Sequence, residues 1–94
     1  MEKLEKLNIM DKVLRELEDL VNSETALIKK LGQLEAHNIN LGDKTLEKKL
    51  PAIYEHVDQI LAETNLLQTE YSEIRGKFVK DNQLDELIAA QALQ

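Results

Sequence analysis

Residues 10–34 read MDKVLRELEDLVNSETALIKKLGQL, and their apolar side chains recur at alternating steps of three and four residues. On a helix of about 3.6 residues per turn, this spacing produces a stripe more than about 100° wide. The pattern therefore predicts one amphipathic helix from about residue 3 to about residue 37. The stripe consists of three columns: Met10–Leu17–Glu24–Leu31, Val13–Leu20–Leu27–Leu34 and Leu14–Val21–Ile28.

A second pattern of alternating steps begins at Leu46 and predicts a helix over about 44–79. Residues 38–43, NINLGD, separate the two patterns. Asn and Gly suit a helix C-terminus, and Asp43 suits the N-cap of the next helix, so we expect a loop at 38–43. The second stripe is narrower, which is typical of a coiled-coil seam. Its members are Leu46, Leu50, Ile53, Val57, Ile60, Thr64, Leu67, Tyr71, Ile74 and Phe78.

Pro51 lies inside the second pattern and lacks the N–H that a helix interior needs, at a cost of about 3 kcal/mol. Two interpretations remain. Either the helix is kinked at 47–51, or residues 44–49 form a separate turn and the main helix starts near Leu50. The unbroken heptad phase favours the kink.

A short third helix is predicted over about 83–93. The heptad phase fails after Phe78, which indicates a loop near 80–82, and Asn82 is a suitable N-cap. The acidic residues in its first turn interact favourably with the positive end of the helix dipole. The apolar members of this helix are Leu84, Leu87, Ile88 and Leu93.

Together these elements predict an all-α fold and a single helical domain over residues 1–94. A helix of about 35 residues is about 52 Å long, whereas a compact domain of this size is roughly 30 Å across. We therefore expect an elongated antiparallel two-helix hairpin with a short C-terminal helix, completed as a coiled-coil or helical bundle by another chain. The alternative is a bend at 22–25 that lets the chain close on itself as a monomer.

Composition excludes several classes of protein. The chain has 94 residues, no Cys and a formal net charge of −6. Without thiolates there is no zinc ribbon, iron–sulfur cluster or disulfide scaffold. No apolar run approaches the roughly 18 residues of a membrane span, and the first residues lack a signal-peptide apolar region. The acidic balance argues against nucleic acid as a partner. We expect a soluble intracellular protein in the cytoplasm, with the nucleus as the alternative.

The residue patterns that carry chemistry are missing. His37 and His56 have no strong ligand three or four residues away, so we expect no metal site. The three Gly residues are isolated, which argues against a phosphate loop. Neither Ser23 nor Ser72 has a His within helical reach. We therefore expect no catalytic residues, no cofactor and no enzyme activity.

A partner surface is predicted on the first helix, because its stripe is wider than the second helix can cover. The column that stays complete over four heptads is Val13–Leu20–Leu27–Leu34, and a second long helix would pack on it. The polar Glu24 belongs to the same expected interface, where it either reaches water or pairs with a basic residue of the partner. The partner is a second copy or a different protein. We expect the intrachain seam to contain Leu50, Ile53, Val57, Ile60, Leu67, Tyr71, Ile74 and Phe78.

Charges along the two helices are unevenly distributed. Lysines gather near the turn, whereas acidic residues dominate the middle of both helices. The distribution either orients a partner or is ordinary scatter on a solvated face. The lysines concerned are Lys29, Lys30, Lys44, Lys48 and Lys49.

In style the chain resembles small coiled-coil subunits of large eukaryotic assemblies. Four short pieces, Leu66-Leu67, Glu70-Tyr71, Phe78-Val79 and Leu84-Asp85-Glu86-Leu87, faintly resemble the C-terminal coiled coil of the dynactin small shoulder subunit family. Their spacing differs from that of the family, and they cover less than a third of the chain. No residue role is carried over. We expect a scaffolding subunit, the alternative being a small regulatory binder such as a secretion-type chaperone or a phage-type inhibitor.

Overall fold

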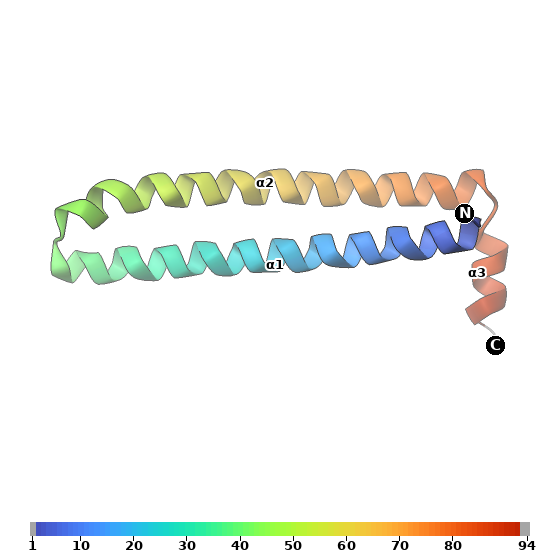
Figure 1. Cartoon of the computed structure of the whole chain (residues 1–94), viewed down its shortest axis with the longest axis horizontal. Helices are drawn as coiled ribbons and strands as arrows, with labels where there is room; N and C mark the ends of the chain where they lie inside the picture. Colours follow the sequence, from blue (N-terminus) through green and yellow to red (C-terminus); the bar gives the residue numbers. More distant parts are fainter. Residues whose placement is uncertain (1, 93–94) are drawn as a thin grey trace.

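The computed structural model describes residues 2–92, and these form two long helices and a short third. Helix α1 spans Lys3–Leu41, α2 spans Lys44–Asp81 and α3 spans Asp85–Ala92. The two long helices run antiparallel and side by side, and α3 crosses the end of the hairpin where α1 begins (Figure 1). The extents are 61 × 23 × 18 Å, and the radius of gyration is 20.2 Å, against about 12 Å for a compact chain of this length. The predicted elongated all-α hairpin is confirmed.

The turn between the long helices is shorter than the sequence predicts. The expected loop at 38–43 was wrong for most of its length, because α1 continues to Leu41 and only two residues separate the helices. Gly42 adopts the left-handed conformation that ends many helices, with φ 64°, and its N–H donates to the Asn38 carbonyl at 2.7 Å. The helix therefore gains one more turn before the glycine ends it.

Two polar side chains hold this turn. The Asn38 side chain accepts from the Asp43 N–H at 2.8 Å and donates to the Asp43 carbonyl at 3.1 Å. The Asp43 carboxylate in turn accepts from the Leu46 N–H at 2.9 Å, which is the N-cap that the sequence indicates. Asn38 is buried, so these two hydrogen bonds satisfy a side-chain amide that is shielded from water.

Pro51 lies within one continuous helix. Helix α2 runs unbroken from Lys44 to Asp81, so residues 44–49 are not a separate turn. The first turns of α2 tilt away from the axis of its remainder in Figure 1, as expected where a proline removes one helical hydrogen bond.

The open end of the hairpin contains the main apolar cluster. Leu7, Val79 and Leu84 are buried together, and Leu4, Phe78 and Ile88 pack around them. The Leu84 N–H donates to the Val79 carbonyl and the Gln83 N–H to the Lys80 carbonyl, a Schellman arrangement in which Gln83 has φ 54°. These contacts fold α3 across the hairpin end rather than along its length.

Asn82 does not cap α3 as predicted. Its side-chain amide donates to the Phe78 carbonyl at 2.9 Å, so Asn82 caps the end of α2. Helix α3 begins at Asp85, and the predicted helical residue Leu93 lies outside the described residues.

Candidate protein-interaction face

The seam between α1 and α2 uses two columns from each helix. From α1 it takes the columns that contain Leu17 and Val21. From α2 it takes Leu50–Val57–Thr64–Tyr71–Phe78 together with Tyr54–Leu61–Gln68–Arg75, all of which are buried or half-buried. The polar Gln68 and Arg75 fit there because their long stems cover apolar surface while their ends reach water.

Four of the residues predicted for this seam lie elsewhere. Ile53, Ile60, Leu67 and Ile74 form a column at seven-residue spacing on α2, and each is about half exposed. That part of the prediction was wrong. This column and the Tyr54 column lie on either side of the Leu50–Val57–Thr64–Tyr71–Phe78 column. Sequence spacing alone favours the more apolar of the two, the Ile53 column, as the one that packs in the seam. Here α2 turns its less apolar flank toward α1, where Arg75 donates to Asp11 at 2.9 Å.

The register of the hairpin can be read from two hydrogen bonds across the seam. Thr64 donates to Glu24 at 2.8 Å, and Arg75 donates to Asp11. Because the two helices are antiparallel, two residues that lie opposite each other across the seam, at the same level, have residue numbers with a nearly constant sum. This sum is 88 for the first pair and 86 for the second. The exposed columns meet this condition, with sums of 87: Val13 with Ile74, Leu20 with Leu67, Leu27 with Ile60 and Leu34 with Ile53.

The two exposed apolar columns share one side of the hairpin. Glu18 of α1 and Ser72 of α2 line one shallow groove between the helices, so their columns share a face. On α1, Leu20 lies on the other side of the seam columns from Glu18, and on α2, Leu67 lies on the other side from Ser72. The columns of Leu20 and Leu67 therefore share the face opposite the groove. We call it the apolar face, and it consists of Val13, Leu20, Leu27, Leu34, Ile53, Ile60, Leu67 and Ile74.

Seven of the eight side chains on the apolar face are between 41% and 54% exposed, and Val13 is half-buried. Levels along this face are about 10.5 Å apart, which is seven residues of helix rise. The other side, the polar face, carries Asp11, Glu18, Thr25, Asp58, Asn65 and Ser72 at equivalent positions. Isolated exposed apolar side chains are ordinary, but a continuous double column on one side is not.

Glu24 lies in the seam rather than in the predicted partner interface. It is 5% exposed, so it does not reach water as one interpretation expected. Its Oε1 accepts from the Thr64 hydroxyl, and the same hydroxyl lies 3.0 Å from the Ile60 carbonyl. One hydroxyl proton serves one acceptor at a time. The second oxygen, Oε2, has no hydrogen-bond partner among the described residues.

Charged residues border the apolar face on its outer edges. On α1 the border carries Ile9, Glu16, Ser23, Lys30 and His37, and on α2 it carries Lys49, His56, Glu63, Glu70 and Lys77, all exposed. The half of the border near the turn is basic, and the half toward the open end is mostly acidic. Lys77 at the far end is the exception.

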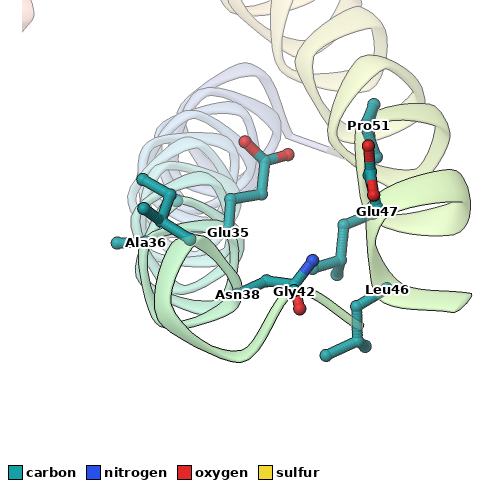
Figure 2. A pocket seen from close by; sticks show the side chains of 10 residues that line it. Glu35, Ala36, Asn38, Gly42, Leu46, Glu47 and Pro51 are labelled. Atoms are coloured by element: carbon teal, nitrogen blue, oxygen red, sulfur yellow. The ribbon is translucent and has the colours of Figure 1, made fainter. Parts of the chain in front are cut away.

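A second hollow lies at the turn, between α1 and the start of α2. Figure 2 shows Glu35 of α1 and Glu47 of α2 on its two sides, with Asn38 at the turn. The Asn38 amide is already occupied by Asp43, and Glu47 lies 3.7 Å from the exposed Lys44 ammonium. Within residues 2–92, no group of three or more His, Asp or Glu side chains could hold a metal ion. His37 and His56 are exposed on the border of the apolar face.

The comparisons with known proteins give no match to a protein-family model, a curated protein or a solved structure. In the described part of the chain, no helix combines the length and the apolar character needed to cross a membrane.

Proposed function

We propose that this protein is a non-enzymatic protein–protein interaction module, a small scaffolding subunit that docks helices of another chain on its apolar face. The observation that carries the proposal is the double column of eight aliphatic side chains along one side of the hairpin. Burying a Leu or Ile side chain fully contributes about 1.5–3 kcal/mol, so each half-exposed member retains about half of that for a partner.

The interior of the hairpin supports the same proposal. The buried apolar side chains in the described part of the chain are Leu7, Met10, Leu31, Leu50, Val79 and Leu84. Most of them lie near the two ends, and the middle of the seam contains the polar pair Glu24 and Thr64. A chain of this size buries little surface on its own, and docking on the apolar face adds the missing core.

Helix α2 adds a further argument. It turns a column with Gln68 and Arg75 toward α1 and leaves a wholly aliphatic column, Ile53 to Ile74, in solvent. An isolated hairpin gains more by burying the aliphatic column. Leaving the aliphatic column of α2 exposed is advantageous when a partner covers that column.

Site-specific photo-crosslinking in the native host tests the proposal. A photoreactive phenylalanine analogue replaces Leu27 on the apolar face, and in a control chain it replaces the exposed Asp58 on the polar face. We expect protein adducts from position 27 and few from position 58. Equal yields at both positions, or no adducts at either, would contradict the proposed function.

A further inference from the structure

The apolar face is large enough for a stable protein interface. Its four levels extend over about 32 Å, which is three heptads of helix rise. Two helices of about 10 Å diameter make it about 20 Å wide. The face therefore offers about 640 Å² on one chain, or about 1,300 Å² when both partners are counted, within the range of specific interfaces.

We infer that the apolar face binds a second copy of this chain, with the two hairpins packed face to face and head to tail. The inference rests on the proposed function and names its partner. The two-fold axis lies perpendicular to the long helices and passes midway between the levels of Leu20 and Leu27. About this axis Leu20 opposes the partner's Leu27, and Ile60 opposes the partner's Leu67.

The charges on the border of α1 fit this arrangement. Glu16 and Lys30 lie on either side of the axis at nearly equal distances, about seven residues away. The head-to-tail dimer places Glu16 level with the partner's Lys30, and the symmetry repeats the pair. Complementary charges at the edge of an apolar interface set its orientation.

The border of α2 contributes less to the orientation. His56 and Glu70 lie at similar distances on either side of the same axis, so His56 comes level with the partner's Glu70. Glu63 lies close to the axis and meets its own copy, which opposes association. Lys49 comes level with the partner's Lys77 at the two ends of the face, about 20 Å from the axis.

The other two-fold arrangement, with the turns of both hairpins at the same end, lacks this complementarity. It would bring the halves near the turns together, with Lys30 level with the partner's His56 and His37 level with the partner's Lys49. It would also bring the acidic halves together, with Glu16 near the partner's Glu70. The Glu16–Glu70 repulsion disfavours that orientation, whereas the two Glu16–Lys30 pairs favour the head-to-tail dimer.

Spin-label distances separate the two orientations, and the chain contains no native Cys to interfere. A nitroxide is attached to His37→Cys near the turn, with Ser23→Cys near the axis as the control; both positions are exposed. In the head-to-tail dimer the two labels at position 37 are about 40 Å apart, since 27 residues of helix rise separate their levels. The two labels at position 23 are then close, at less than about 20 Å.

Light scattering on the purified chain supplies the mass for the same samples. We expect twice 10.8 kDa, together with the long distance at position 37 and the short one at position 23. A monomer at concentrations of tens of micromolar would overturn the inference, and so would a short distance at position 37. Adducts from position 27 to a different protein, with a monomeric purified chain, would also overturn it while leaving the proposed function intact.

Charge reversal provides a second test. Glu16→Lys with Glu70→Lys makes the border basic along both halves, and Lys30→Glu with His56→Glu makes it mostly acidic. We expect each variant alone to self-associate on the order of tenfold more weakly at low salt, and an equimolar mixture to recover wild-type affinity as a mixed dimer. Unchanged self-association of both variants would contradict the role of the border.

Discussion

The apolar face and the polar face of the hairpin arise from the same two helices at the same seven-residue spacing, yet they differ completely in chemistry. Aliphatic side chains at four levels form the first, whereas carboxylates, amides and hydroxyls dominate the second. Each long helix thus has two columns for its intrachain neighbour and a third that serves neither the seam nor solvation. The third columns of the two helices form the surface on which we propose that another chain binds.

The largest difference is expected between a seam residue and a face residue three positions apart. Leu31 is 9% exposed, and Leu34 is 41% exposed. Leu31→Glu buries an unpaired carboxylate in the seam, which should lower the free energy of unfolding by about 3–5 kcal/mol. Leu34→Glu should change it by less than about 1 kcal/mol.

Urea unfolding followed by circular dichroism measures both variants in dilute solution, below the concentration at which the chain self-associates. Equal destabilisation by the two substitutions would mean that Leu34 belongs to the intrachain core. The distinction between seam and face would then fail on α1.

A smaller effect is expected at the polar layer in the middle of the seam. Thr64→Val removes the hydroxyl that donates to buried Glu24, and should lower the free energy of unfolding by about 1–3 kcal/mol. Thr69→Val is the matched control, since its hydroxyl bonds only to the exposed Asn65 carbonyl. That change should stay within about 0.5 kcal/mol. If thermal melts of the two variants coincide, the Glu24–Thr64 hydrogen bond does not contribute to stability.

The smallest effect is expected at the edge of the polar face. Asp11→Asn removes the ion pair with Arg75, in which both side chains are about one-third exposed. Pairs that open to solvent contribute about 0–1 kcal/mol, and salt screens them. Melting curves at low and high salt should show a small loss that disappears as salt rises. A loss above about 2 kcal/mol that persists at high salt would show that this pair fixes the hairpin register.

Sequence periodicity was sufficient for the two long helices because it depends only on local spacing. The tilt at the start of α2 (Figure 1) and the cap at Asp43 follow from local chemistry in the same way. The residue at which α1 ends could not be predicted from local spacing, because Asn38 and Gly42 end the helix together through hydrogen bonds that span the turn. Composition alone marks these residues as helix breakers.

The face of α2 is the most informative difference between sequence and structure. Ile60 and Leu67 continue an unbroken apolar pattern, and nothing in their spacing says which neighbour they meet. The choice depends on the side from which α1 approaches, which involves the turn, the Glu24–Thr64 hydrogen bond and the Asp11–Arg75 pair. Residues 40 or more positions apart make these contacts, beyond what local spacing contains. The same choice places the α2 column beside the column predicted on α1.

The mass of two matched double variants tests the central claim most directly. Ile60→Glu with Leu67→Glu places two carboxylates on the apolar face, and Asn65→Glu with Ser72→Glu places two on the polar face of the same helix. Light scattering after size exclusion should show a monomer for the first variant and the wild-type dimer for the second, with the helical circular dichroism signal retained in both. Equal masses for the two variants, or an unfolded Ile60→Glu/Leu67→Glu chain, would contradict an apolar face that binds another chain.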